Sequence, residues 1–386
     1  MGTAPFVFSG AVALLAYTYG VYPAIIGLLA RLTPRPVRAR LDYCPRVTVI
    51  IVVRNEAARI EAKLASCLAQ DYPAGRLDVL VADDGSCDGT VDRVRAFGHA
   101  RVRLVAFAQP RGKSACINDA MQSCETDVVV LTDARQMLHP RAVRRLVADL
   151  ADPGVGAVGG ELVFVDCDGS AHARGMGAYW RFETFLRNAE SSIHSSPGLS
   201  GALYALRRSC FRPIAPDTIL DDVAIPMQVV RQGFRAVSQP LAVAYDHVTT
   251  SPAQERRRKI RTLAGNYQLL VRAPWLVVPW RNPIALQFIS HKVLRLFGPW
   301  ALLAALVSNG VLALDAPLIW GGPLALQAGL YGLAWRAQRR PGTAWGMPAR
   351  LAATFVALNA YAVLGLLEFL GNRDLHRWGG TAPPRE

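Results

Sequence analysis

The sequence predicts an α/β domain built on a mostly parallel sheet and flanked by helices that cross a membrane. Short β-branched runs alternate with helical stretches through the middle of the chain. Long apolar segments lie at residues 5–30 and again beyond residue 284. The hydrophobic fraction of 52% is therefore concentrated towards the two ends of the chain.

The first apolar segment predicts a transmembrane helix within residues 1–32. Residues 5–30 carry no charge, and about 20 apolar residues are enough to cross a bilayer. A secretory signal peptide is the weaker interpretation, because no basic residue precedes the apolar run and the run is too long. Arginines follow directly, which places the N-terminus outside and the main domain in the cytoplasm. They are Arg31, Arg35, Arg38 and Arg40.

The chain beyond residue 284 predicts further membrane contact. Residues 284–296 mix apolar and basic residues, which suits a helix at the membrane interface. About three spans are expected within residues 297–371, followed by a tail at 372–386. The individual spans are expected at 297–315, 317–335 and 350–371. Four spans in all give a multi-pass protein of a bacterial-type inner membrane, with Arg373 and Arg377 outside.

The net charge of +14 does not indicate a nucleic-acid partner. The sequence has no motif that interleaves aromatic and basic residues as RNA-binding domains do. Many arginines instead flank the apolar segments, where they would meet anionic lipid headgroups. None of the seven cysteines is paired at CxxC spacing, so neither a zinc site nor a disulfide framework is indicated.

Continuous apolar runs predict the strands of the sheet. Because helical stretches separate them, they favour parallel strands covered on both faces. In such sheets ligands bind beyond the carboxyl ends of the strands. The runs are residues 47–53, 78–83, 102–107 and 127–133, with 155–165 and 201–207 extending or flanking the sheet. The domain is expected to span residues 45–272, with a mobile or acceptor-facing segment at 168–200.

Polar residues follow the first two runs and are expected to meet at one edge of the sheet. A carboxylate there can accept hydrogen bonds from a base or a ribose. The alternative is a polar strand–helix turn in which Ser86 or Asp88 caps the next helix. The residues concerned are Arg54, Asn55 and Glu56 after the first run, and Asp83 and Asp84 at the end of the second.

Asp133 closes the fourth run and is the expected metal ligand. Mg²⁺ or Mn²⁺ bound to a diphosphate uses one or two carboxylates together with phosphate oxygens. Lys113, in a Pro-Arg-Gly-Lys segment, could place a cation near the same phosphates. The alternatives are a strand-end turn for Asp133 and a solvated loop lysine for Lys113.

Two later motifs carry charge suited to group transfer. Asp221 and Asp222 precede a helix-like run, and one of them could act as a general base towards a hydroxyl group. Acidic residues also stabilise helix N-termini, which is the alternative. The basic run from Gln254 includes Arg257 and Arg258, whose guanidinium groups could clamp a diphosphate or lie on an anionic membrane surface.

Taken in order, these motifs resemble the membrane-embedded branch of the family 2 glycosyltransferases, which includes cellulose, chitin, hyaluronan and poly-N-acetylglucosamine synthases. The resemblance covers roughly residues 45–270 and the flanking membrane segments. It implies a GT-A fold, a UDP-sugar donor, a divalent cation and inversion at the anomeric carbon. It also implies a glycan or lipid-linked acceptor in cell-surface polysaccharide synthesis, with other synthesis subunits or further copies of the chain as partners.

The resemblance implies a role for the donor-side residues. The uridine-contacting aspartates of the family match Asp83 and Asp84. The nucleotide-facing loop after the first strand matches Arg54-Asn55-Glu56. The metal-binding DxD motif matches Asp133-Ala134-Arg135, in which Arg135 replaces the second carboxylate and could contact phosphate directly.

The acceptor-side motifs match in the same way. The TED base motif of the family resembles Leu220-Asp221-Asp222, which favours Asp222 as the base. Gly201 begins a segment that resembles the acceptor-side strand. The QxxRW motif of the processive synthases resembles Gln254 to Arg258, with Arg258 in place of the tryptophan. That tryptophan packs against the acceptor sugar in the synthases.

Two other functions stay open. A related nucleotidyltransferase would carry a glycine-rich phosphate loop near the first strand, which residues 53–56 are not. A catalytically inactive membrane subunit or scaffold of a polysaccharide complex would explain Arg135 in the DxD position. The carboxylates retained at the other motif positions argue against it.

Overall fold

The computed structural model describes all residues except 1, 166–170, 248–251, 341–344, 373 and 378–386. Within the described part, eight strands form one sheet in the order β3-β2-β1-β4-β7-β6-β8-β5. The strands are β1 Val47–Val53, β2 Leu77–Asp83, β3 Val102–Ala106, β4 Val128–Asp133, β5 Met137–Leu138, β6 Val155–Val165, β7 Leu203–Arg207 and β8 Arg235–His247.

The predicted strand runs are confirmed, and the sheet is mixed. Strands β1 to β4 are parallel, while β7 runs antiparallel to both β4 and β6. In the parallel half, Val53 of β1 pairs with Asp83 of β2, and Val52 pairs with Asp133 of β4. The carboxyl ends of β1, β2 and β4 are therefore level, which brings their polar termini to one edge.

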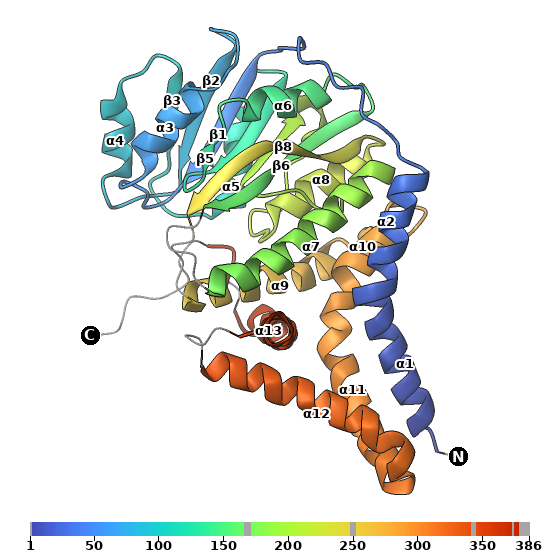
Figure 1. Ribbon diagram of the computed structural model, residues 1–386. Helices are drawn as coiled ribbons and strands as arrows, with labels where there is room; N and C mark the ends of the chain where they lie inside the picture. The colour runs from blue at the N-terminus through green and yellow to red at the C-terminus, as the bar shows by residue number, and fades with distance from the viewer. Residues whose placement is uncertain (1, 166–170, 248–251, 341–344, 373, 378–386) are drawn as a thin grey trace, which may run out of the picture.

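Helices cover both faces of this sheet (Figure 1). On one face α3 Ile60–Leu68, α4 Thr90–Phe97 and α6 Ala142–Asp149 bury their apolar sides against alternate strand residues. On the other face lie α5 Lys113–Gln122 and α8 Asp221–Arg231. The same face also receives Leu269 of α9 Pro252–Arg272 and Phe288 of α10 Ala285–Phe288.

The remaining helices lie below the sheet in Figure 1 and include the membrane segments. Of the described chain, three helices are long and apolar enough to cross a membrane: Ala4–Leu32, Ala285–Asp315 and Met347–Gly371. The first comprises α1 Ala4–Ala16, the π turn Tyr17–Val21 and α2 Tyr22–Leu32. The second comprises α10, the π turn Ile289–Val293 and α11 Leu294–Asp315, and the third is α13 Met347–Gly371.

Three features differ from the sequence-based expectations. The segment expected at 317–335 forms the helix α12 Pro317–Arg339, but this helix is not among the three candidate spans. The expected interfacial helix at 284–296 has no separate boundary, because α10 continues into α11 through the π turn. Most of the segment expected to be mobile, 168–200, forms the long helix α7 Ala171–Ile193, while its first residues lie outside the described chain.

The chain after α13 returns to the sheet domain. Arg261 Nε of α9 donates a hydrogen bond to the Leu375 carbonyl at 3.1 Å, and His376 packs against Gly112. The expectation that Arg377 lies on the opposite side of the membrane is therefore wrong, because Arg377 belongs to this docked turn. The same expectation for Arg373 falls on a residue outside the described chain.

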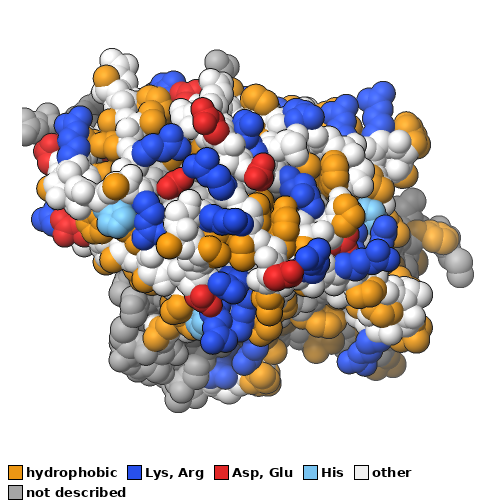
Figure 2. Space-filling model, turned by 90° about the horizontal axis from the view of Figure 1, so that it is seen from above, with side chains coloured by type: hydrophobic (Ala, Val, Ile, Leu, Met, Phe, Trp, Pro, Cys, Tyr) orange, Lys and Arg blue, Asp and Glu red, His pale blue; other side chains and the backbone are white. Residues whose placement is uncertain are grey.

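Seen from above, the molecule carries basic side chains over much of this face (Figure 2). Acidic and hydrophobic side chains lie between them on this face.

Candidate active site

The loops after β1 and β2 are joined to each other by side-chain contacts. Asn55 adopts a positive φ of 55°, a backbone conformation that asparagine tolerates better than most residues. Its backbone N–H donates to Ser86 Oγ at 2.9 Å, and its Oδ1 accepts from the Cys87 N–H at 2.9 Å. The next residue, Glu56, donates its N–H to Thr90 Oγ1 and pairs with Arg59. The two predicted loops therefore form one rim, on which Arg54 is half-buried.

Asp83 and Asp84 are both buried, but their carboxylates make different hydrogen bonds. Asp84 uses both carboxylate oxygens on a neighbouring loop, accepting from the Arg111 N–H at 2.6 Å and from the Gly112 N–H at 2.9 Å. Asp83 Oδ1 accepts from the Ser86 N–H at 2.9 Å, while its buried Oδ2 has no partner in the described chain. Asp84 thus positions the 111–112 loop, and Asp83 keeps one acceptor oxygen for a ligand.

Lys113 joins the predicted metal ligand Asp133 to Asp221, one of the two predicted catalytic carboxylates. Its Nζ lies 3.0 Å from Asp133 Oδ1 and 3.3 Å from Asp221 Oδ1. Burial would lower the pKa of Lys113, but the carboxylates of Asp133 and Asp221 hold it above its ordinary value. Burial would raise the pKa of Asp133, and the Lys113 ammonium holds that pKa below its ordinary value. Lys113 and Asp133 therefore remain charged together at neutral pH.

The two aspartates at the start of α8 differ in the contacts of their carboxylates. Asp221 uses Oδ1 on Lys113 and accepts at Oδ2 from the Tyr204 hydroxyl at 3.2 Å. No described residue makes a hydrogen bond to the carboxylate of Asp222. Burial and then the neighbouring Asp221 raise the pKa of Asp222 to about 6. A carboxylate with a raised pKa and without a hydrogen-bond partner is suited to accept a proton near neutral pH.

Gly201 lies directly beside this carboxylate. A Cβ atom built on Gly201 would stand 3.0 Å from Asp222 Oδ2, closer than ordinary van der Waals contact. Only glycine therefore leaves the carboxylate in its present position. The segment that starts at Gly201 continues into β7, which carries Tyr204, so this segment contacts both members of the Asp221–Asp222 pair.

Arg135 lies in the DxD position but is held by another residue. Its Nη2 is 2.5 Å from Asp246 Oδ2 on β8, and Gln136 Nε2 donates to the same oxygen at 3.0 Å. Asp246 is almost completely buried. In the described chain no group of three or more histidine, cysteine or acidic residues could hold a metal ion. Asp133 therefore fits a cation only where the ion also bonds to oxygens of the substrate.

The basic run lies on α9, on the side of the site that faces the membrane helices. Arg258 is paired with Glu255 at 3.7 Å, and its charge contributes to the lowered pKa of Asp133. Arg257 and Gln254 are exposed. Arg261, one turn after Arg258, was not predicted as a site residue. Burial lowers its pKa, and the carboxylates of Asp221, Asp133 and Asp222 act in the opposite direction, so Arg261 faces the site.

The structure thus brings together residues from loops and strands far apart in sequence. At or beside the carboxylate centre lie Asp133, Lys113, Asp221, Asp222, Gly201 and Arg258. The rim formed by Asn55, Glu56, Asp83 and Asp84 is linked to it through the Asp84–Gly112 contact. The sequence analysis did not identify Tyr204 or Asp246. Each contacts a residue that is distant in sequence, Asp221 and Arg135 respectively, and becomes its neighbour only in the folded chain. The i, i+3 spacing from Arg258 could have pointed to Arg261.

The comparisons with known proteins concern the family and the fold of the chain. Residues 45–265 match the family model described as glycosyltransferase like family 2. An N-acetylglucosaminyltransferase of Azorhizobium caulinodans is 28% identical over 244 residues, which cover 59% of this chain and 61% of the relative. A poly-beta-1,6-N-acetyl-D-glucosamine synthase of Staphylococcus aureus is 22% identical over 60% of this chain and 57% of its own length. The chain therefore spans about three fifths of the length of these relatives.

A solved structure matches the whole chain. A mannosyltransferase of Pyrobaculum calidifontis, in complex with GDP-Man and Mn²⁺, superposes with a TM-score of 0.73 at 27% identity. The match covers 95% of this chain and 99% of the other, so it includes the candidate membrane spans as well as the sheet domain. The expected GT-A fold is confirmed by this likeness. Together with the family match, it establishes that the chain belongs to glycosyltransferase family 2.

Proposed function

We propose that this protein is an inverting, membrane-bound glycosyltransferase that moves a sugar from a nucleoside diphosphate donor onto a glycan or lipid-linked acceptor. The observation that carries the proposal is the charged centre at the sheet edge. There Lys113 joins Asp133 to Asp221, while the adjacent Asp222 has no hydrogen-bond partner among the described residues. Fixed donor-side charges and an available base are what sugar transfer to a hydroxyl group requires.

The donor is proposed to be a UDP-sugar. Asp83 Oδ2, a buried acceptor without a partner in the described chain, is available for an N–H or O–H group of the nucleoside. The curated relatives are named for N-acetylglucosamine transfer, which favours UDP-N-acetylglucosamine. The solved mannosyltransferase holds GDP-Man, so GDP-mannose is the alternative donor. Of the rim residues, Arg54, Asn55 and Glu56 would contact the nucleotide side.

A divalent cation is proposed to bind with the donor, and Asp133 would hold it. Mg²⁺ or Mn²⁺ with one protein carboxylate and two phosphate groups is a common arrangement. Such an ion would neutralise charge that develops on the leaving diphosphate. Lys113, Arg258 and Arg261 add fixed positive charge on the same side of the site, with Arg257 and Gln254 farther along the surface of α9. Arg135 is assigned to the structural pair with Asp246 and not to phosphate.

The transfer step follows from the position of Asp222. The acceptor hydroxyl oxygen attacks the anomeric carbon from the side opposite the diphosphate, and its proton passes to the Asp222 carboxylate. A new carbon–oxygen bond forms as the bond to the diphosphate oxygen breaks, so the anomeric configuration is inverted. Asp221 is held between Lys113 and Tyr204. Its charge disfavours ionisation of Asp222 and so makes Asp222 a stronger base.

The membrane location is proposed from the three candidate spans and the arginines after the first of them. The first span would leave the N-terminus outside and the catalytic domain in the cytoplasm of a bacterial-type cell. There the domain would meet cytoplasmic nucleotide sugars. A role in cell-surface polysaccharide synthesis, with other synthesis subunits or further copies of this chain as partners, extends this proposal.

Nucleotide release by the full-length protein in detergent tests the proposal. The assay compares UDP-N-acetylglucosamine, UDP-glucose, UDP-galactose and GDP-mannose, each with Mg²⁺, with Mn²⁺ and with EDTA. Asp222→Asn serves as the matched control for contaminating hydrolases. We expect release from one donor, lost with EDTA and lost in the variant. Equal release by wild type and variant with every donor would contradict the proposal.

A further inference from the structure

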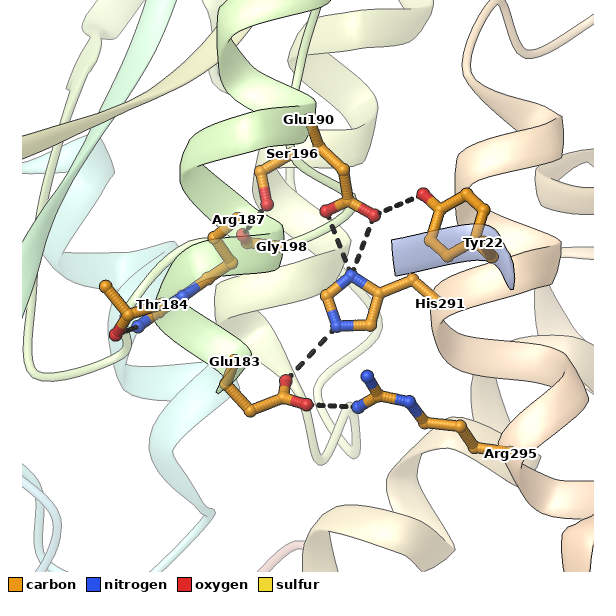
Figure 3. Close-up of polar contacts among 9 residues, drawn as sticks. All are labelled: Tyr22, Glu183, Thr184, Arg187, Glu190, Ser196, Gly198, His291 and Arg295. Atoms are coloured by element: carbon orange, nitrogen blue, oxygen red, sulfur yellow. Dashed lines mark hydrogen bonds and ion pairs between the residues drawn. The ribbon is translucent and has the colours of Figure 1, made fainter. Parts of the chain in front are cut away.

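A buried polar cluster joins the catalytic domain to two membrane helices (Figure 3). At its centre the imidazole of His291, in the second candidate span, is fully buried. His291 Nδ1 lies 2.9 Å from both carboxylate oxygens of Glu190, and Nε2 lies 3.1 Å from Glu183 Oε2. Glu183 also pairs with Arg295, and the Tyr22 hydroxyl of the first span donates to Glu190 Oε1 at 2.6 Å. The glutamates both belong to α7.

Both membrane helices change their winding at the level of this cluster. Tyr17–Val21 and Ile289–Val293 are π turns, and the Tyr17 hydroxyl lies 2.9 Å from Ser290 Oγ. A π turn inside an α-helix is uncommon and frequently marks a functional position. The second of these π turns carries His291 and, next to it, Lys292. His291 of this π turn lies against Glu183 and Glu190 of α7 in the catalytic domain.

A chain of contacts leads from the cluster to Asp222. The carbonyl of Glu190 accepts from the His194 N–H at 3.0 Å as α7 ends. In the loop that follows, Ser196 Oγ donates to the Gly198 carbonyl at 2.8 Å. The Leu199 N–H then donates to the Asp222 carbonyl at 2.9 Å. The loop from residue 194 to 201 therefore contacts Asp222 at two points. Leu199 donates to its backbone carbonyl, and Gly201 lies beside its side-chain carboxylate.

Lys292 also acts on the base through its charge. The positive charge of Lys292 acts to lower the pKa of Asp222 and so favours its ionised carboxylate. The other charged and titratable groups that face Asp222 come from several elements packed around it. In the described chain they are Asp221 of α8, Lys113 of α5, Asp133 of β4, Arg261 of α9 and Tyr204 of β7. Lys292 is the member of this set that a membrane helix supplies.

We propose that the second membrane helix forms part of the active site. In this arrangement His291, held between Glu183 and Glu190, positions the loop that supports Asp222 and sets Lys292 against that carboxylate. The inference rests on the proposed function, in which Asp222 is the base. His291 is then a positioning residue, and the charge of Lys292 favours the ionised form of the base. The membrane helices then do more than anchor the enzyme.

The first test removes the positive charge of Lys292. Turnover of full-length Lys292→Met is measured between pH 5 and 8.5 with the donor that supports wild-type turnover. Loss of the cation should move the acidic limb of the rate profile to higher pH by roughly one unit. The rate at pH 5.5 should then fall about tenfold relative to wild type, and the rate at pH 8 should change little. Lys292→Arg, which keeps the charge, should restore the wild-type limb.

Arg281→Met is the matched control, since Arg281 is exposed in the segment before α10. Its rate profile should coincide with that of the wild type. An unchanged acidic limb in Lys292→Met, alongside an active wild type, would overturn this inference and leave the proposed function standing. Absence of turnover by the wild type with every donor would overturn both.

The second test separates positioning from folding. His291→Phe should lower kcat about tenfold while KM for the donor stays within twofold, because the donor side of the site is untouched. Thermal unfolding in detergent and direct donor binding are measured on the same preparations. A folded variant that binds donor but turns over slowly supports the positioning role. A loss of rate that merely matches the loss of folded protein, or an unchanged kcat, would overturn it.

Discussion

Lys113 Nζ lies 3.0 Å from Asp133 Oδ1, so the expected metal ligand of this site is held by a half-buried lysine before any substrate enters. The same ammonium group reaches Asp221 at 3.3 Å. The lysine therefore connects the donor carboxylate at the end of β4 to the acidic pair at the start of α8. This contact sets the spacing between the donor side and the acceptor side of the site.

Replacing Lys113 by methionine should disable the site without unfolding the domain. Two carboxylates would face each other without the intervening cation, and like charges at that distance raise one of their pKa values. We expect kcat/KM to fall by roughly 10² to 10³. Steady-state turnover and donor titration measure the effect. A variant with wild-type kcat/KM would show that the contact is only structural.

Gly201→Ala should slow the reaction by crowding the base. The added Cβ would lie 3.0 Å from Asp222 Oδ2, so the carboxylate must move by a few tenths of an ångström. We expect roughly a tenfold loss of kcat with little change in donor affinity. Gly310→Ala is the control, because a Cβ built there meets nothing within 4 Å. Equal rates for the two variants would contradict the account.

Arg135→Leu should destabilise the fold, because it leaves the buried Asp246 without its cation. Breaking a buried ion pair by removing one partner costs about 3–5 kcal/mol. Thermal unfolding in detergent should show a clear drop in the midpoint temperature. The double variant Arg135→Leu/Asp246→Asn should regain much of it. If Arg135 contacts donor phosphate instead, the single variant would keep its stability and show a raised KM for the donor.

Asp149→Asn should stabilise the protein in a pH-dependent manner. Burial raises the pKa of Asp149 to about 6, against an ordinary value of 3.8, although Gln239 Nε2 donates to both of its oxygens. The group therefore contributes most to stability below about pH 4, and that contribution is lost as the pH rises through 6. The neutral variant should gain roughly 1–3 kcal/mol at pH 7.5. Denaturant unfolding at pH 4.5 should show a much smaller gain.

Much of the donor side was predictable from sequence, because strand ends obey simple geometry. The runs ending at Asp83 and Asp133 predicted parallel strands, and level parallel strands bring their ends together. The different hydrogen bonds made by Asp83 and Asp84 were not predictable from the sequence. Which of the two carboxylates accepts a hydrogen bond from the Gly112 N–H depends on the position of the 111–112 loop, and the tertiary fold determines that position.

The membrane side of the site was the least predictable part. Apolar composition indicated that helices would be present, but it did not show where they touch the catalytic domain. Glu183 and Glu190 lie in the segment expected to be mobile or acceptor-facing, and their buried contacts with His291 form only where α7 packs against the second candidate span. Arg135 was likewise judged from its motif position, whereas its partner Asp246 is more than a hundred residues away.

The most direct test of the account compares Asp222→Asn with Asp221→Asn in the full-length protein. Asp222→Asn should bind the donor within twofold of wild type and lose transfer by about 10² to 10⁴. Asp221→Asn should disturb Lys113 and weaken donor binding as well as turnover. The wild-type rate itself should rise through a pH of about 6, the pKa of Asp222. Normal turnover by Asp222→Asn would contradict the assignment of the base and with it the mechanism.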